Sequence, residues 1–346
     1  MNRRARTVFA LMGTFAVLMT VVCLFVGSSR MSVADCARAL AGKGSAADTR
    51  IMYRIRLPRV LAALIAGAGL SVSGLIMQTV LNNGMASPST LGVTNAAVFG
   101  ANLSIIAFAG GFLSTGNSLA AYWVGTNPYA TSAAAFIFAL FSVLLILGLS
   151  RRRAFSPGVI VLSGITIGSV WTAGTTVLQF YSTDVGLSAA VIWSFGDLGR
   201  ATYETDIIML AALVIAITYF SLMAWRYNAL LSGGETALSL GVNVASLRFV
   251  SLLLASLVTA VCVSFLGIIG FVGIICPHIA KKLLGKDHRR SIPLSALTGS
   301  LLLLCADTLS RCAGNGSALP AGAVTSLLGA PFFIALILGG RGRTDA

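Results

Sequence analysis

Apolar residues lie along this chain in long stretches, separated by short polar segments that carry most of the arginines and lysines. Crossing the hydrocarbon core of a membrane takes about 20 apolar residues in a helix, and a backbone in lipid must satisfy its own hydrogen bonds. The pattern therefore predicts an all-α, polytopic membrane protein, with residues 1–346 in a single transmembrane domain of about ten helices. The expected spans are residues 7–27, 58–80, 91–110, 130–149, 158–181, 205–225, 247–266, 270–284, 292–312 and 322–340.

Composition agrees with a membrane protein, since 57% of the residues are hydrophobic, only 10% are charged and the mean hydropathy is +0.91. A net charge of +14 would point to nucleic acid in a soluble protein. Here the basic residues fall between apolar stretches, where they orient helices, so we expect no nucleic-acid partner. The first stretch follows Arg3, Arg4 and Arg6 and is longer than the apolar core of a signal peptide, so we expect a retained helix.

The basic residues also predict the topology. If the N-terminus is cytoplasmic, alternation places most basic groups inside and makes both termini cytoplasmic. The inside groups are residues 151–153, Arg226, Arg248, residues 281–290, and Arg341 with Arg343. The first outer loop breaks the rule, because it holds Arg30, Arg38, Lys43, Arg50, Arg54, Arg56 and Arg59. The arginines at residues 54–59 either anchor lipid phosphates or bind a partner.

Small residues recur at helical spacing in two spans, namely Gly67, Gly69, Ser71 and Gly74, and Gly267, Gly270 and Gly273. In lipid they let helix backbones approach closely, so we expect tight packing within the bundle. The glycine-rich segments lack the G-x-x-x-x-G-K-[ST] spacing, so we expect no nucleotide hydrolysis by the chain itself. The two histidines, His278 and His288, lie on separate segments and make a poor metal site, and the cysteines are interpreted as packing residues.

The loop at residues 230–247 is polar yet has the signals of a short helix. Ser232 can cap it, Glu235 favours its first turn, and Gly241 can end it. Asn243 or Ser246 can then begin the next helix. Such an element either docks into a groove of another protein or is an ordinary interfacial connector.

The fifth span carries a polar stripe at mixed three- and four-residue steps: Thr166, Ser169, Thr172, Thr176 and Gln179. Polar groups in lipid are costly unless they face protein or water. The stripe therefore either lines a transport pathway or joins helices to one another, and the sequence does not separate the two.

Several motifs resemble the FecCD permease family, in order and spacing, from about residue 50 to residue 340. They are Arg56-Leu57-Pro58-Arg59, residues 67–78, Ala86-Ser87-Pro88 before Leu91-Gly92, residues 270–278, Asp287-His288-Arg289-Arg290 with Pro293, Ala306-Asp307, and Leu319-Pro320-Ala321-Gly322 before residues 329–332. The resemblance implies the type II fold of ABC importer permeases, in a multi-pass subunit of a prokaryotic cytoplasmic membrane. It also implies three partners: cytoplasmic ATP-binding subunits, an extracytoplasmic substrate-binding protein and a second permease subunit, identical or similar.

The resemblance assigns roles to residues by position. The loop between the sixth and seventh spans contacts the ATPase in this family, which implies coupling roles for Ser232, Gly234, Glu235, Thr236, Leu238, Leu240, Gly241 and Asn243. Outward arginines receive the binding protein in the family, which implies docking roles for Arg56, Arg59 and Arg311. Snorkelling to lipid phosphates, and an i,i+4 pair between Asp307 and Arg311, are the structural alternatives.

Two segments correspond to those that narrow the pathway on the cytoplasmic side in the family, namely the turn with Asn83, Gly84 and Met85, and the loop Phe155-Ser156-Pro157. The family usually has proline and an acidic residue where this chain has Gly84 and Ser87. Because glycine loosens a turn that proline stiffens, the transfer of a gating role is less direct here.

The resemblance favours an iron chelate, a siderophore or haem, as cargo, moved by alternating access. Vitamin B12 or another corrinoid is the first alternative, and we expect no resident cofactor or metal. An ion-coupled secondary transporter is a further alternative; such proteins usually keep carboxylates near the bilayer midplane. In this chain we expect Asp307 to be the only acidic residue inside a clear apolar span, and it has Arg311 beside it.

Overall fold

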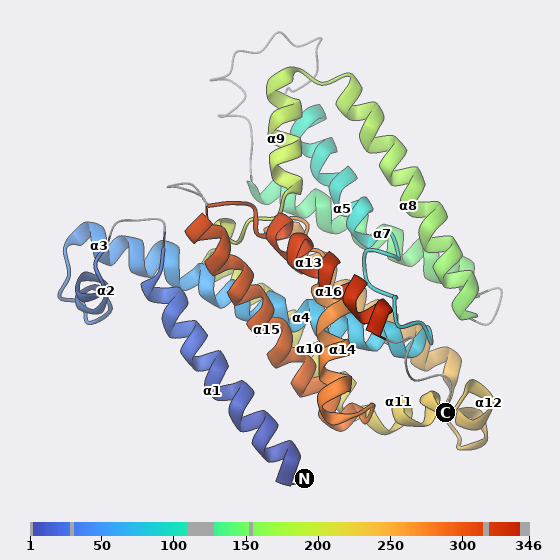
Figure 1. Cartoon of the computed structure of the whole chain (residues 1–346). Helices are drawn as coiled ribbons and strands as arrows, with labels where there is room; N and C mark the ends of the chain where they lie inside the picture. The colour runs from blue at the N-terminus through green and yellow to red at the C-terminus, as the bar shows by residue number, and fades with distance from the viewer. Residues whose placement is uncertain (1–2, 28–30, 109–127, 152–154, 314–317, 340–346) are drawn as a thin grey trace.

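The computed structural model describes residues 3–27, 31–108, 128–151, 155–313 and 318–339, and side chains up to residue 334. Every predicted span contains a helix, so the all-α prediction is confirmed (Figure 1). These helices are α1 (Arg3–Phe25), α4 (Leu57–Val80), α5 (Val93–Asn102) continued by the π-helical η2 (Leu103–Phe108), α7 (Pro128–Arg151), α8 (Pro157–Phe180), α10 (Tyr203–Leu222), α13 (Val244–Leu266), α14 (Val272–Leu284), α15 (His288–Ala313) and α16 (Ala321–Gly339). Within the described ranges, seven helices are long and apolar enough to cross a membrane, and α5 with η2, α14 and α16 are shorter.

Several shorter helices lie between these spans. The first connecting segment forms α2 (Val33–Leu40), α3 (Ala46–Ile51) and the π-helical turn η1 (Met52–Arg56), which continues into α4. After α8 come α9 (Asp184–Ser194) and the 3₁₀ turn η4 (Leu198–Arg200), and after α10 come α11 (Ala224–Leu231) and α12 (Gly234–Ser239). Arg30, Arg152, Arg153, Arg341 and Arg343 of the charge pattern lie outside the described residues.

Helix α4 is the core of the bundle, and its glycines place it there. Of its most apolar stretch, 89% is buried, against 17% for α8. The backbone at Gly67 faces the Gly299 carbonyl of α15, and Gly74 faces the Gly273 carbonyl of α14, so closely that a β-carbon would collide with either oxygen. The Ser71 hydroxyl contacts the Ser295 carbonyl oxygen at 2.6 Å. The predicted close packing is therefore confirmed, because only small side chains permit this approach.

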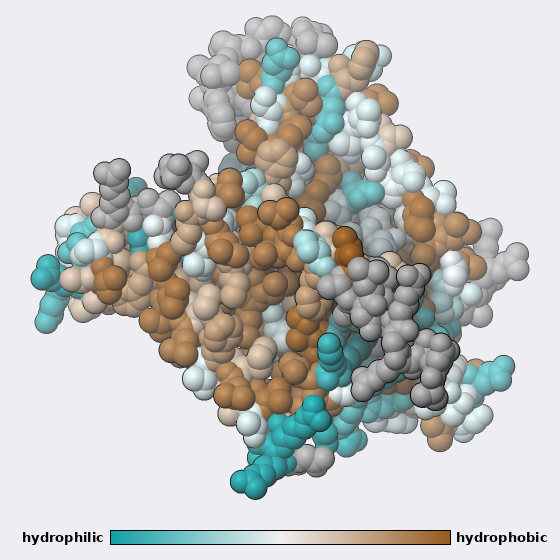
Figure 2. Space-filling model, in the orientation of Figure 1, coloured by the Kyte–Doolittle hydropathy of each residue, from teal (hydrophilic) through white to brown (hydrophobic). Residues whose placement is uncertain are grey.

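The outer helices present apolar side chains to their surroundings. Leucine, isoleucine, valine and phenylalanine side chains of α1, α7, α8 and α10 are exposed, and apolar residues cover the middle of the face in Figure 2, with hydrophilic residues along its lower margin. In Figure 1, α1 and α8 lie on opposite margins of the bundle. Such a surface suits lipid or a second membrane subunit.

Hydrogen bonds gather the helix ends into two groups. At one end, which we call the Arg248 end, Arg248 of α13 donates to carbonyls of Val80 and Phe155. At the other, the Asp307 end, Asp307 of α15 pairs with Arg59 of α4. This grouping agrees with the alternation expected from sequence, while the side that faces the cytoplasm stays a prediction.

The glycine contact can be tested by adding one methyl group. We expect Gly74→Ala to lower the stability of the bundle by about 1–3 kcal/mol, because its β-carbon meets the Gly273 carbonyl. Gly148→Ala in α7 is the matched control, since a β-carbon there would meet no described atom within 4 Å beyond its own stretch of helix. Thermal unfolding in detergent measures both, and equal melting temperatures for the two variants would contradict this account of the core.

Candidate functional site

The loop after α11 forms the short helix that the sequence predicts. Glu235 lies in the first turn of α12, and Gly241 follows the helix with a φ of 79°, in the left-handed region that favours glycine. The Asn243 side chain accepts a hydrogen bond from the Ser246 N–H at 3.0 Å and thereby caps α13. The expected cap at Ser232 is wrong: Ser232 follows the last residue of α11, and Gly233 precedes α12, because α11 uses the residues up to Leu231.

The surface of this loop combines polar residues with exposed leucines. The other predicted coupling residues, Gly234 and Thr236 included, lie on α12 or beside it. Leu238 and Leu240 are 59% and 60% exposed, although the segment around them is polar. Ala237 and Val242 are buried and hold α12 against the bundle. The structure thus presents α12 as a supported projection with two apolar side chains on its surface.

The turn after α4 projects at the same end. Asn82 takes a left-handed φ of 46°, whereas Gly84 does not, so the conformational freedom of Gly84 is not used in this turn. The Asn83 side chain accepts a hydrogen bond from the Met85 N–H at 2.9 Å, and the Met85 side chain is 57% exposed. Ser87 is buried and contacts the Ser89 hydroxyl at 2.8 Å. The structure leaves the gating role of the turn untested.

The second predicted pathway segment begins α8. Phe155 has a left-handed φ of 55°, Ser156 precedes the helix, and Pro157 occupies its first turn, where a missing N–H costs nothing. Arg248 connects this segment to the turn after α4, since its two hydrogen bonds end on Val80 and Phe155. The two predicted pathway segments, the turn after α4 and the start of α8, are therefore both anchored by the Arg248 side chain.

The polar stripe of α8 lies on the surface of the single chain. Thr166, Ser169, Thr172 and Thr176 are exposed, and each hydroxyl donates to the carbonyl four residues earlier. Thr172 also accepts from Asn95, and Gln179 donates to Asn102, both on α5. The stripe thus joins α8 to α5 at two positions, while the hydroxyls of Thr166, Ser169 and Thr176 bond only to their own helix among the residues that the structure describes.

A buried polar cluster joins the Arg248 end of the bundle to the core. Lys281 donates to Gln78 of α4 at 2.9 Å, and His288 contacts Thr79 at 2.8 Å and Asn228 of α11 at 2.9 Å. Burial raises the pKa of Asp287, but hydrogen bonds from Asn228 and the Arg289 N–H, together with the charges of Arg290 and Arg289, outweigh this effect, so the pKa lies below its ordinary value. The His288 side chain is buried and forms hydrogen bonds within the core.

The arginines predicted to dock a binding protein are buried and bound within the chain. Arg59 Nε lies 2.7 Å and Arg311 Nε 3.0 Å from the carboxylate of Asp307, which is fully buried. Arg59 also lies 3.6 Å from Asp197. The i,i+4 pair between Asp307 and Arg311 is therefore present, and it is part of a larger cluster.

The same arginines hold the last turn of α1. Arg56 donates to the carbonyls of Leu24 and Phe25, and Arg311 donates to those of Cys23 and Val26, at 2.7–3.1 Å. The last four carbonyls of a helix have no partner within it. Two guanidinium groups thus satisfy the end of α1, which explains why charges sit at this point of the bundle. Whether they also meet another protein stays a prediction.

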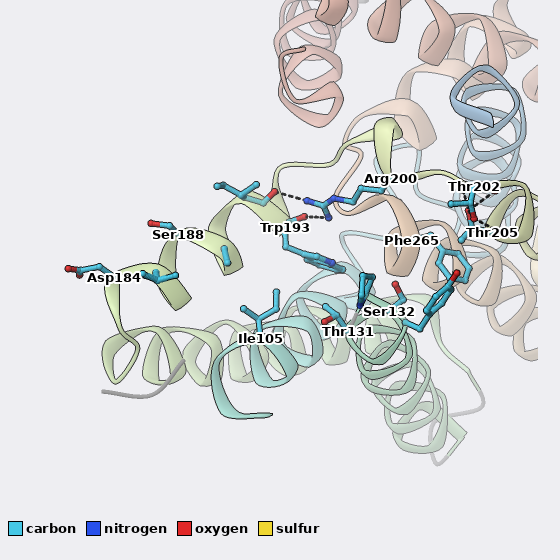
Figure 3. Close-up of a pocket in the computed structure, with 15 residues that line it drawn as sticks. Ile105, Thr131, Ser132, Asp184, Ser188, Trp193, Arg200, Thr202, Thr205 and Phe265 are labelled. Atoms are coloured by element: carbon cyan, nitrogen blue, oxygen red, sulfur yellow. Dashed lines mark hydrogen bonds between the residues drawn. The ribbon is translucent and has the colours of Figure 1, made fainter. Parts of the chain in front are cut away.

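A cavity of about 810 Å³ opens between α7, α9 and the start of α10. Its lining is mostly apolar, with hydroxyls from Thr131, Ser132, Ser188, Thr202 and Thr205 (Figure 3). Arg200 donates to the carbonyls of Ile192 and Trp193 and lies 5.9 Å from the Trp193 ring centre. Burial lowers the pKa of Arg200, while Asp197 opposes this shift. None of the predicted α8 stripe residues lines this cavity.

One acidic residue departs from the expectation that only Asp307 lies inside a span. Asp206, in the first turn of α10, is 3% exposed, and neither carboxylate oxygen has a hydrogen-bond partner among the described residues. Asp206 could have been noticed in the sequence, because it lies at the edge of the predicted span at residues 205–225. Among these residues no group of three or more His, Cys, Asp or Glu side chains is placed to hold a metal ion.

Comparison with known proteins agrees with this arrangement. The profile of the FecCD transport family matches residues 15–339. A Methanocaldococcus jannaschii protein named as an ABC transporter permease is 45% identical over 93% of this chain and 91% of its own length. The hemin transport permease HmuU of Yersinia pestis is 35% identical over 93% of each chain, and the vitamin B12 import permease BtuC of Vibrio cholerae is 31% identical over 85% and 84%.

A solved structure has the same fold. It is an inward-facing transporter assigned to the metal-chelate ABC type, with a TM-score of 0.82 at 26% identity, covering 96% of this chain and 99% of the other. Fold and sequence together define a membrane permease subunit of the type II ABC importer class. The chain belongs to the FecCD transport family.

The charge cluster at the Asp307 end can be tested by neutralising its centre. Asp307→Asn removes the buried counter-charge of Arg311 and the nearer of the two carboxylates beside Arg59, so we expect a loss of about 3 kcal/mol or more in stability. Asp35→Asn is the control, because Asp35 and Arg38 form an exposed pair, and surface pairs contribute little. Thermal unfolding measures both, and a wild-type melting temperature for Asp307→Asn would refute a structural role for the cluster.

Proposed function

We propose that this chain is the membrane subunit of an importer that carries an iron chelate, a siderophore or haem, across the cytoplasmic membrane of a prokaryote. Separate ATP-binding subunits drive it. The observation that carries this proposal is the supported projection of α12, with Leu238 and Leu240 exposed on an otherwise polar loop. Apolar side chains on a segment too polar for lipid suit the groove of another protein.

Transport proceeds by alternating access in this proposal. A second subunit, a copy of this chain or a similar one, packs against the exposed face of α8, and the hydroxyls of Thr166, Ser169 and Thr176 then face the shared pathway. Asn83 with Met85, and Phe155 with Pro157, border its cytoplasmic end. These three hydroxyls bond to no other helix in the described part of the chain, which supports this, since polar side chains in a membrane are favoured where they meet protein or water.

The cargo is argued from the relatives. Permeases named for ferric hydroxamate, ferric citrate and hemin are 31–35% identical to this chain. Permeases named for vitamin B12 or cobalamin are 31–34% identical, so a corrinoid is the second candidate. The described residues offer no group of metal ligands, which suits a cargo that crosses as an intact complex.

An extracytoplasmic binding protein delivers the cargo at the Asp307 end. Docking on Arg56, Arg59 and Arg311 requires that acidic groups reach guanidiniums already bound to carbonyls and to Asp307. We expect Arg56→Gln and Arg59→Gln proteins with wild-type melting temperatures to bind this partner more weakly, by a margin that shrinks as salt rises. Unchanged affinity at low salt would leave the arginines with their structural role alone.

The function is tested with proteoliposomes that contain this chain and the ATP-binding subunits with which it co-purifies. We expect uptake of a ferric hydroxamate or haem only when ATP is present on the ATPase side. Cobalamin uptake instead would identify the corrinoid alternative. Uptake driven by a proton or sodium gradient without ATP would overturn the proposal.

Two variants connect this experiment to α12. Leu240→Asp removes an exposed apolar contact, so we expect it to reduce co-purification of the ATPase without altering the melting temperature. Ser239→Ala, on the same helix, is the matched control, because its hydroxyl contacts only the Glu235 carbonyl among the described residues. Equal ATPase binding by both variants would remove α12 from the interface.

A further inference from the structure

Arg248 connects three segments that are far apart in the sequence. It lies in the second turn of α13, immediately after the loop that carries α12. Its Nε donates to the Val80 carbonyl at 3.1 Å, and its Nη1 donates to the Phe155 carbonyl at 3.3 Å. Val80 is the last residue of α4, just before the turn with Asn83, and Phe155 precedes the first turn of α8.

Both carbonyls that accept from the guanidinium lie where regular helix hydrogen bonding ends or has not begun. At the end of α4, the carbonyls of residues 77–79 accept N–H groups of the following turn, and the Val80 carbonyl accepts Arg248. Phe155 has a left-handed φ of 55°, which is costly for a bulky residue and persists only where neighbours hold it. The Phe249 ring lies 5.7 Å from the Phe155 ring and supplies a second contact.

The connection from α12 to Arg248 is stiff. Past Gly241, the Val242 N–H donates back to the Ala237 carbonyl at 3.0 Å, which closes the end of α12. The Asn243 cap then fixes the start of α13, and Val242 and Val244 are buried. Arg248 lies one helical turn after Val244, so a displacement of α12 reaches its side chain without an intervening free loop.

We propose that Arg248 is a positioning residue that couples α12 to both predicted gating segments, the turn at residues 82–88 and the segment at residues 155–157. Its planar fork has fixed N–H directions, so one rigid group keeps the two carbonyls in register with each other and with α13. Movement of α12 then moves both segments together. The inference rests on the proposed function, because an ATPase must move α12.

The test compares transport with hydrolysis in the reconstituted complex. A glutamine cannot span both carbonyls, so we expect Arg248→Gln to keep ATP hydrolysis while uptake of a ferric hydroxamate per ATP hydrolysed falls about tenfold. Arg248→Lys keeps the charge without the fork and should fall in between. Arg226→Gln is the matched control, since Arg226 is exposed on α11 and lies over Trp225. If Arg248→Gln takes up as much ferric hydroxamate per ATP hydrolysed as the wild type, the inference is overturned.

Hydrogen exchange of the full-length permease in nanodiscs gives a second measurement that needs no cargo. We expect Arg248→Lys, and Arg248→Gln where it folds, to speed exchange at residues 82–92 and 155–160 together, with α12 unchanged. Exchange that rises at neither segment, or at one alone, would show that Arg248 does not hold them jointly. If the wild-type complex shows no ATP-dependent uptake, the proposed function itself fails; normal wild-type uptake with an unchanged Arg248→Gln ratio refutes only the coupling role.

Discussion

The close approach of α4 to α14 and α15 is the contact on which the rest of this bundle depends. Lipid tails are as apolar as leucine, so burial alone does not drive membrane helices together; they associate through dispersion contacts and hydrogen bonds. At Gly67 and Gly74 the absent side chains bring backbone against backbone, and Ser71 and Ser300 add hydroxyl contacts to carbonyls across the same interface. Once α4 is enclosed in this way, its two ends fix where the charged and polar clusters lie.

Features with a local cause could be predicted from the sequence. The spans follow from runs of apolar residues, the end of α12 from Gly241, and the start of α13 from Asn243, since each needs only the preferences of neighbouring residues. Helices α2 and α3 were missed although they had local signals. Ser32 with Asp35, and Ser45 with Asp48, form capping contacts at their first turns, and the S-x-x-D spacing could have revealed both.

Features that depend on distant partners could not be predicted in the same way. The sequence shows that Arg56, Arg59 and Arg311 sit near helix ends, but not that their guanidiniums turn inward to Asp307 and to the last carbonyls of α1. The dual contact of Arg248 joins residues 168 and 93 positions away from it. Long side chains reach several ångströms from their helix, so their direction is decided by tertiary packing.

The attachment of α1 has a consequence for the order in which the protein is assembled during synthesis. The stretch of α1 that crosses the membrane is only 11% buried, and besides its packing against α15 it is held by two arginines at the Asp307 end. Arg56 emerges from the ribosome soon after α1, whereas Arg311 follows Cys23 by 288 residues. Helix α1 therefore lacks part of the protein partners of its C-terminal turn until α15 has been inserted, so its final position is fixed late in synthesis.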